Sequence, residues 1–316
     1  LGRLLTGRIH SGIARPNIPV KAIARDGSFI EQGRITKILA FRGLERVPVE
    51  EAEAGDIVAI AGLSTATVAD TICDPAVEAP LAAQPIDPST IAMTFSVNDG
   101  PYAGQDGSKV TSRQIWDRLA REAEGNVAIR VTQNDQKDSF EVAGRGELQL
   151  AVLIENMRRE GYELCAGRPR VLFQNDPVTG ARLEPIEEVV IDVDEPYAGV
   201  VVEKLTSRKG ELQEMRQAGA GKVRLVFHAP SRALIGYHGE FLTDTRGTGV
   251  LNRLFHGWEP YKGAIAQRYT GVMISSEQGD AVAYALWNLE ERGAMFINAG
   301  DKVYSGMLIG EHNKGS

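Results

Sequence analysis

The stretch VRLVFHAPSRALIGYHGEFLTDTRGTGVLNRLFHGWEPY, residues 223–261, decides the fold of this chain. It begins and ends with apolar runs typical of strands, and a helical pattern lies between them at residues 232–242. The Arg- and Gly-rich turn Thr243–Gly249 follows that pattern. Because no nucleophile, base and orienting group occur together here, the stretch indicates contact with a large anionic partner rather than catalysis.

The pattern around this stretch predicts a domain at residues 177–261 with the order strand, helix, strand, strand, helix, strand. Residues 85–176 repeat that order, because two periodic helical segments, 109–124 and 147–160, alternate with short apolar runs. The order βαββαβ is that of the ferredoxin-like unit. We therefore expect two α+β domains of this kind in tandem.

The remaining segments predict β-rich structure. Residues 1–84 contain short strand-like runs separated by glycine turns, a pattern typical of a closed or nearly closed β-barrel. Closely spaced X-Pro pairs within residues 74–88 indicate a stiff linker after this barrel. Residues 262–316 contain extended runs around a helical segment at 281–292, so we expect an incomplete C-terminal β-rich domain with one helix.

Composition indicates a soluble globular protein of several domains. The chain has 316 residues, of which 43% are hydrophobic and 24% charged, and this excludes a mainly disordered chain. No apolar run approaches the ~18 residues of a membrane span, and the first residues lack the pattern of a signal peptide. Cys73 and Cys165 lie far apart and form no metal or disulfide motif. We expect a cytoplasmic protein with no membrane partner.

Charge is unevenly distributed along the chain. The net charge of −7 argues against nucleic-acid binding, but residues 177–203 carry seven acidic side chains against one basic, and residues 204–268 carry eleven basic against five acidic. The two runs either neutralise each other across one folded domain or leave an anion-binding face. Charge alone does not distinguish these two arrangements.

Three histidines and a run of carboxylates are the candidates for a metal or acid–base site. His228, His238 and His256 are spaced by ten and eighteen residues, which is not the i, i+4 spacing of ligands on a helix. The acidic residues within 187–195 alternate with apolar residues, so a solvated strand face is expected. We therefore expect no metal site and no catalytic residues.

Nucleotide-binding motifs are likewise not expected here. A phosphate-binding loop needs Gly, four residues, then Gly-Lys-Ser/Thr, but the nearest match has Arg216 in place of the first glycine and Val223 in place of the hydroxyl. A hairpin turn is the expected structure there. The segment Gly144–Glu147 is compatible with a phosphate nest or with a structural turn at a helix start. We expect no cofactor-binding residue in this chain.

Several motifs resemble those of the translational GTPases. GRIHSG (7–12), GRITKIL (33–39) and EAEAGDIVAIAGL (51–63) are similar to the second-domain barrel of elongation factors Tu and G. EVAGRGELQLAVLIENMRREGYEL (141–164) is similar to domain III of elongation factor G, and residues 243–261 resemble the end of its domain V. The resemblance implies a translation-factor β-barrel followed by the two ferredoxin-like domains.

Two further segments resemble one family more closely than elongation factor G. They are HAPSRALIGYHGEF (228–241) and the run from Glu277 to Gly293, and both indicate the ribosome-binding TypA/BipA family. The resemblance implies a GTPase whose GTP and magnesium are held by an N-terminal G domain, the motifs of which are not in this chain. For the chain itself it implies no cofactor and no enzymatic activity on its own.

The resemblance also implies the partners. We expect binding to the ribosome through rRNA, A-site tRNA and ribosomal proteins, docking of the protein's own G domain, and a monomeric state. The implied roles are translation, ribosome assembly (biogenesis) and stress adaptation. The alternative is a protein-interaction scaffold that mainly docks the G domain or ribosomal proteins.

Basic residues in and around the opening stretch are the candidates for RNA contact, because a guanidinium pairs with phosphates through its planar fork. Arg246 lies in the glycine-flanked turn, and Arg253 and Lys262 follow it. Aromatic residues between them either stack on unpaired bases or pack in the core. The candidate RNA-binding residues are Arg208, Lys209, Lys222, Arg246, Arg253, Lys262 and Arg268.

Overall fold

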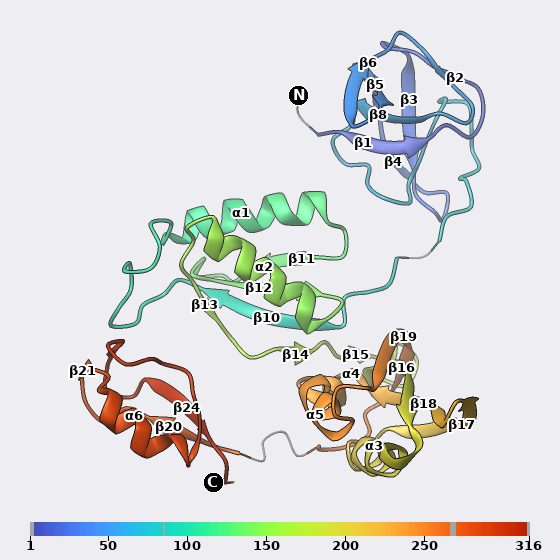
Figure 1. The fold of residues 1–316 in the computed structure, drawn as a ribbon. Coiled ribbons are helices and arrows are strands. Elements are labelled where there is room, and N and C mark those ends of the chain that lie inside the picture. Colours follow the sequence, from blue (N-terminus) through green and yellow to red (C-terminus); the bar gives the residue numbers. More distant parts are fainter. Residues whose placement is uncertain (1–2, 85, 266–269, 315–316) are drawn as a thin grey trace. The chain divides into compact units, whose positions relative to one another are not determined.

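The computed structural model describes residues 3–84, 86–265 and 270–314. The chain divides into two compact units, residues 1–88 with 122–128, and residues 89–121 with 129–316 (Figure 1). The finer division at residues 84, 176 and 261 stays a prediction, as does the incompleteness of the last domain. Within the described ranges, no helix combines the length and the apolar character that a membrane span requires.

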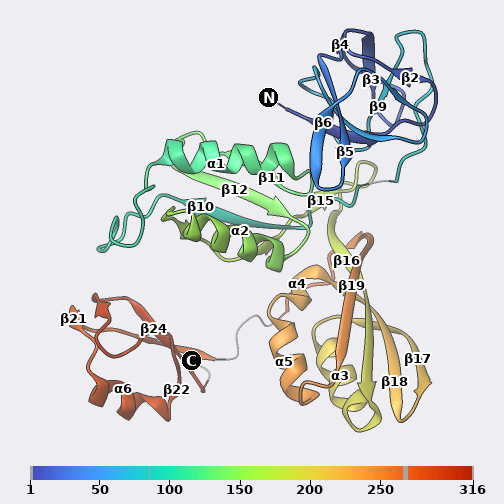
Figure 2. The same ribbon diagram turned by 45° about the horizontal axis from the view of Figure 1, so that its top comes forward.

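The described part of residues 1–84 contains nine strands that surround one apolar core (Figure 2). They form antiparallel sheets of order β1-β8-β5-β6, β4-β3-β9 and β2-β7. Val20, Ile38, Val58 and Leu63 belong to this core, which confirms the predicted translation-factor β-barrel domain. The strands are β1 Leu5–Arg8, β2 Ile13–Ala14, β3 Pro19–Ile23, β4 Phe29–Arg34, β5 Lys37–Arg42, β6 Glu45–Pro48, β7 Ala52–Glu53, β8 Ile57–Ala61 and β9 Thr71–Cys73.

One carboxylate holds the loop that follows β8. Glu31 on β4 accepts hydrogen bonds from the backbone N–H groups of Thr65 and Ala66, both at 2.6 Å, and of Ser64 at 3.1 Å. Burial opposes the charged form of Glu31, but these hydrogen bonds outweigh it and lower the pKa of the carboxyl to about 2. The loop is therefore fastened to the barrel by a charged group.

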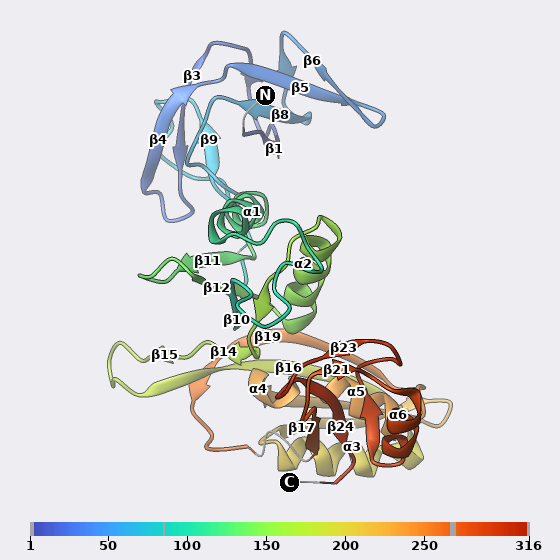
Figure 3. The same ribbon diagram turned by 90° about the vertical axis from the view of Figure 1, so that its left-hand side faces the viewer.

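The next domain has the predicted βαββαβ order. Its antiparallel sheet runs β11-β12-β10-β13, with β14 also pairing with β10. Figure 3 shows α1 and α2 on the same side of this sheet. Helix α2 buries Leu150, Leu153 and Met157, three and four residues apart, so one face of the helix enters the core. The elements are β10 Ile91–Ser96, α1 Ser112–Gly125, β11 Arg130–Gln133, β12 Ser139–Gly144, α2 Glu147–Arg159, β13 Cys165–Ala166 and β14 Arg170–Val171.

The second βαββαβ domain has the same sheet plan. Its strands run in the order β19-β16-β18-β17, all antiparallel, and the short β15 pairs with the start of β16. Val189, Ile191 and Val193 alternate along β16 and are fully buried in a core shared with α3 and α5. The elements are β15 Gln174–Asn175, β16 Arg182–Asp194, α3 Glu195–Ser207, β17 Glu211–Gly219, β18 Lys222–Pro230, α4 Ser231–Leu234, α5 Tyr237–Asp244 and β19 Val250–Pro260.

Two elements of this domain differ from the prediction. The helix predicted at residues 232–242 is two helices, because Gly236 between them has a left-handed φ of 74°, which an α-helix does not accommodate. The strand predicted at residues 189–193 extends over Arg182–Asp194. Its first half contains Pro185 and several acidic residues. These residue types are uncommon in strands and interrupt the apolar alternation that predicts one.

The described part of the C-terminal segment, residues 270–314, is a small β-rich domain with one helix. Its sheets are β20-β24-β22 and β21-β23, and its core contains Met273, Val303 and Ile309. Helix α6 lies within the predicted range; it has no fully buried residue, and Trp287 is 67% exposed. The elements are β20 Gly271–Ile274, β21 Gly279–Asp280, α6 Ala283–Glu290, β22 Gly293–Met295, β23 Lys302–Val303 and β24 Leu308–His312.

Candidate nucleic-acid interface

Six of the seven candidate RNA-binding residues lie in or next to the domain of β16 to β19, at helix ends and along strands. The seventh, Arg268, lies outside the described residues. The six fall into two groups, exposed cations and cations already paired with carboxylates.

Arg246 is the exposed cation at the end of α5. Its backbone is left-handed, with φ 51°, and its N–H donates to the Thr243 carbonyl at 3.2 Å. Thr248 Oγ1 donates to Asp194 Oδ2 at 2.8 Å and so anchors the far side of the turn to the end of β16. Arg246 is therefore presented to solvent from a turn that is held at both ends.

Backbone conformation and packing within the domain explain why glycine occupies two positions of this turn. Gly247 has a φ of 77°, which a side chain disfavours. At Gly249 a Cβ atom would lie 2.5 Å from Phe241 Cζ and 2.8 Å from Thr245 Oγ1, and both of those side chains are fully buried. Packing inside the domain therefore accounts for Gly249 without a bound partner.

Lys209 is the second exposed cation, and it follows α3. Its φ of 69° is left-handed, and its N–H donates to the Thr206 carbonyl at 3.0 Å. Gly210 continues this helix end by donating to the Leu205 carbonyl at 2.8 Å. Among the described residues, neither Lys209 nor Arg246 has an ion-pair partner within 4 Å, so both charges are available to an anion.

The side chains of Arg208 and Lys222 are already engaged. Arg208 is largely buried, donates to Glu240 Oε1 at 2.5 Å and to the Ala233 carbonyl at 2.9 Å, and lies over the Tyr237 ring. Lys222 Nζ lies 3.2 Å from Asp194 Oδ1. Hydrogen bonds from Thr248 and then Lys222 lower the pKa of Asp194, which keeps this carboxylate charged.

Arg253 and Lys262 are engaged as well. Arg253 Nε lies 3.5 Å from Glu187 Oε2, and its Nη2 lies 3.7 Å from Glu147 Oε1. Burial raises the pKa of Glu187 although Arg253 opposes the shift. Lys262 Nζ lies 2.6 Å from Glu211 and 3.0 Å from Glu259. An RNA phosphate would have to displace these carboxylates before it could pair with either cation.

Neutralisation within the domain accounts for much of the charge asymmetry of the sequence. Strand β16 carries most of the acidic run, and its neighbours β18 and β19 carry basic residues opposite to it. Arg224 donates two hydrogen bonds of 2.7 Å to Asp192, and these lower the pKa of that carboxyl. Glu184 is fully buried and pairs with Arg232, whose side chain is 8% exposed. The acidic and basic runs therefore neutralise each other across the sheet.

The aromatic residues of the opening stretch pack against protein. Tyr237 and Phe241 are fully buried in the core. Trp258 is half-buried, with its ring centroid 5.9 Å from that of Phe255. Tyr261 meets Phe173 edge to face at 5.9 Å and lies under the guanidinium of Arg232. Core packing thus explains most of this set, and base stacking is not needed to account for them.

The two candidate phosphate loops are turns. Residues 219–221 connect β17 to β18 as the expected hairpin. A phosphate loop is followed by a helix, whereas a strand follows these residues. Gly146 precedes the first turn of α2, and the Arg145 N–H before it donates to Gln149 Oε1 at 2.9 Å. The Gln149 side chain therefore already satisfies one of the N–H groups that a phosphate nest would offer to an anion.

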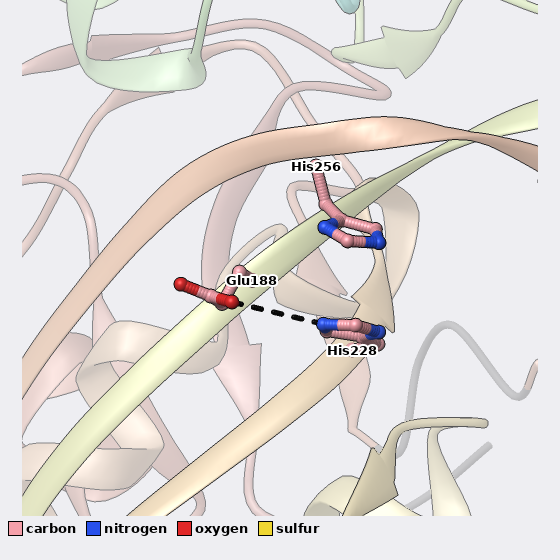
Figure 4. A group of neighbouring side chains, drawn as sticks. All are labelled: Glu188, His228 and His256. Atoms are coloured by element: carbon pink, nitrogen blue, oxygen red, sulfur yellow. Dashed lines mark ion pairs between the residues drawn. The ribbon is translucent and has the colours of Figure 1, made fainter. Parts of the chain in front are cut away.

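The sequence named His228 and His256 as candidates for a metal site, but it did not predict that they lie together with Glu188. Glu188, His228 and His256 come from β16, β18 and β19, and their potential ligand atoms all lie within 4.8 Å of one another (Figure 4). The His228 and His256 ring centroids are 3.9 Å apart. The spacing of the histidines along the sequence argued only against metal ligands on one helix. Strand pairing brings these residues together from distant parts of the sequence.

Curated proteins resemble the chain over nearly all of its length. The Large ribosomal subunit assembly factor BipA of Synechocystis sp. is 46% identical over 314 residues, which are 99% of this chain and 52% of that protein. The protein of the same name from Haemophilus influenzae is 47% identical over 315 residues, and that from Bacillus subtilis is 44% identical over 315 residues. Each of these two alignments covers 99% of this chain and 51% of the relative.

Sequence models of three domain families match successive parts of the chain. The model of elongation factor Tu domain 2 matches residues 2–73, and that of the elongation factor G C-terminus matches residues 181–269. The chain is therefore built from translation-factor domains. The model of the TypA/BipA C-terminal domain matches residues 270–316. The chain belongs to the TypA/BipA family, and it spans about half the length of the curated relatives it matches.

Proposed function

We propose that this chain is the ribosome-binding part of a translational GTPase of the cytoplasm. It contacts rRNA, the end of A-site tRNA and ribosomal proteins, and it acts as a monomer in ribosome assembly, translation or stress adaptation. The remainder of the longer protein holds GTP and magnesium and hydrolyses the nucleotide. The observation that carries the proposal is the identity of 44–47% with proteins named as large ribosomal subunit assembly factors.

Lys209 and Arg246 are the residues of this chain that we place nearest to RNA phosphate. Both are exposed, and both lie on left-handed turns that follow helices. Arg208, Lys222, Arg253 and Lys262 stay in the proposed set, but their contact with RNA requires an exchange of carboxylate partners. Arg268 stays in it on sequence grounds alone.

A salt titration of ribosome binding tests this proposal. We expect the association constant of the chain for large ribosomal subunits to fall linearly with salt on a log–log plot, because phosphate neutralisation releases counterions. Lys209→Glu and Arg246→Glu should each weaken binding and reduce the slope of that plot by about 1. Co-sedimentation at several KCl concentrations measures both quantities.

Arg216→Glu is the matched control. It produces the same change in net charge on the exposed strand β17, where Arg216 lies 3.3 Å from Glu214. We expect its binding to stay close to that of the unmodified chain. A salt-independent affinity, or unchanged binding by the double variant of Lys209 and Arg246, would contradict the placement of RNA at these two residues.

A second candidate function is a scaffold that mainly docks protein. The observation that favours it is the pairing of four candidate cations with carboxylates of the same unit. A pull-down that offers the chain either the isolated G domain of a relative or large ribosomal subunits separates the two functions. Retention of the G domain alone would favour the scaffold, and multiple-turnover GTP hydrolysis by the chain itself would contradict both.

A further inference from the structure

We propose that Glu188, His228 and His256 form a binding site for one divalent zinc-class ion. The three residues come from adjacent strands of one sheet, with Glu188 on the middle strand. Glu188 faces His228 directly in the pairing of β16 with β18. On its other side Glu188 faces Leu254, two residues before His256 on β19. Side chains opposite and diagonal to one another on a sheet face lie within mutual reach.

A β-bulge places the third residue. In the pairing of β16 with β19, Ile186 faces Gly257 and Glu187 faces Phe255, so His256 is the additional residue of the bulge. Bulges bend a strand and redirect a side chain, and they occur often next to functional sites. The His256 ring lies 3.9 Å from the His228 ring, with an angle of 31° between their planes. The bulge therefore brings His256 to the pair formed by the other two residues.

The potential ligand atoms of the three groups lie close to one another, and the two stacked rings would have to rotate apart to bind one ion. His228 Nε2 lies 3.8 Å from Glu188 Oε2, and Figure 4 shows one nitrogen of each ring on the side of the Glu188 carboxylate. Bonds of about 2.0–2.2 Å to a tetrahedral ion place ligand atoms about 3.3 Å apart. Side-chain displacements of roughly 1 Å would bring the observed group to that geometry. The exposed His256 and the half-buried Glu188 have room to rotate.

Among the described residues, Glu188 is also the carboxylate of this strand that has no Arg or Lys partner. Glu184, Asp192 and Asp194 pair with Arg or Lys, whereas Glu188 has an ion pair only with His228 among the described residues. Two imidazoles and one carboxylate are a ligand set that zinc accepts. Because His256 is exposed, a fourth position stays open to water or to a ligand atom of a partner.

Titration of the tag-free chain with Co²⁺ tests the site, since a tetrahedral Co²⁺ complex absorbs visible light and Zn²⁺ displaces it. We expect one equivalent to bind, with loss of the absorption on addition of one equivalent of Zn²⁺. His256→Ala and Glu188→Gln should each weaken binding by more than about tenfold, since even outer-sphere partners of metal sites contribute about that much. His238→Ala removes an exposed histidine outside the group and should bind like the unmodified chain.

Other outcomes overturn the proposal. Absence of a Co²⁺ spectrum in the unmodified chain would show that the two imidazoles only stack on each other. Equal affinity in His256→Ala and His238→Ala would place the metal elsewhere. Circular dichroism of each variant checks the fold, and exposure of His256 makes a folded His256→Ala protein the expected result.

Discussion

Arg246 and Lys209 show how the surroundings of a cation decide its availability. Lys262 and Arg208 have carboxylate partners at 2.6 and 2.5 Å, and a phosphate would have to replace those contacts. For Lys262, burial disfavours the charge, but its hydrogen bonds to Glu211 and Glu259 outweigh burial and raise the pKa. An exposed cation loses no such partner on binding. Net affinity from each of these residues therefore differs although their charges are equal.

Gly249 is a residue whose replacement should damage the Arg246 turn without any change in charge. In Gly249→Ala the new Cβ would lie 2.5 Å from the buried Phe241 ring. We expect a loss of about 1–3 kcal/mol of stability, because overpacking forces a shift of the ring or the backbone. Denaturant-dependent hydrogen exchange of the β18 amides measures the stability of this domain.

Gly239→Ala is the control for that substitution. Gly239 lies in α5 without a left-handed φ, and an added Cβ there would have no atom within 4 Å outside the local helix backbone. Alanine favours helix over glycine by up to ~1 kcal/mol, so this variant should match or exceed the unmodified chain in stability. Equal losses in both variants would contradict the packing argument at Gly249.

Strand β16 is the element on which its domain depends, and its buried ion pair is the contact to test. Arg232 of α4 pairs with Glu184 of β16 and donates to the Gly263 carbonyl at 2.5 Å. Arg232→Ala should cost about 3–5 kcal/mol, because it leaves the buried Glu184 carboxylate without its cation and with only the backbone N–H of Lys262 as a donor. Arg224→Ala removes a solvent-accessible partner of Asp192 and should cost far less, because water replaces the lost contact. Denaturant unfolding of the two variants compares these losses.

The loop after β8 should give the barrel a characteristic acid sensitivity. The folded pKa of Glu31, about 2, lies below its ordinary value of 4.5, so the contribution of this group to stability is complete above that ordinary value. It is lost as the pH falls from about 4.5 to about 2. Glu31→Gln should lower barrel stability at neutral pH and remove part of the acid dependence. Thermal unfolding at several pH values measures both effects, and a parallel pH profile in the variant would contradict the role of Glu31.

At the scale of the whole molecule, the order of domains follows from the sequence and the contacts at the candidate sites do not. Helix α2 lies within one residue of its predicted range, because apolar residues recur along it with a helical period, although the residues that it buries are Leu150, Leu153 and Met157. The break at Gly236 was not predictable, since a single glycine is tolerated inside a helical pattern. The Glu188, His228 and His256 group depends on strand register and on a bulge, which are properties of the folded sheet.

The same reasoning applies to the candidate RNA-binding residues. The sequence analysis selected them by their charge and by their place in and around the opening stretch. It could not show that Arg253 lies beside Glu187, because that contact depends on the pairing of β16 with β19. The exposed cations Lys209 and Arg246 were in the predicted set, but nothing in the sequence separated them from the paired ones.

The left-handed backbone of Arg246 lowers the stability of the domain at a residue that we expect to contribute to ribosome binding. A left-handed φ costs a residue with a side chain about 1 kcal/mol that it does not cost glycine. Arg246→Gly should therefore raise the denaturant midpoint of its domain while weakening ribosome binding, whereas Arg246→Ala keeps the Cβ and should weaken binding alone. Unfolding and co-sedimentation of these two variants measure the pair of effects. Selection for a robust fold and selection for ribosome binding would then favour different residues at position 246.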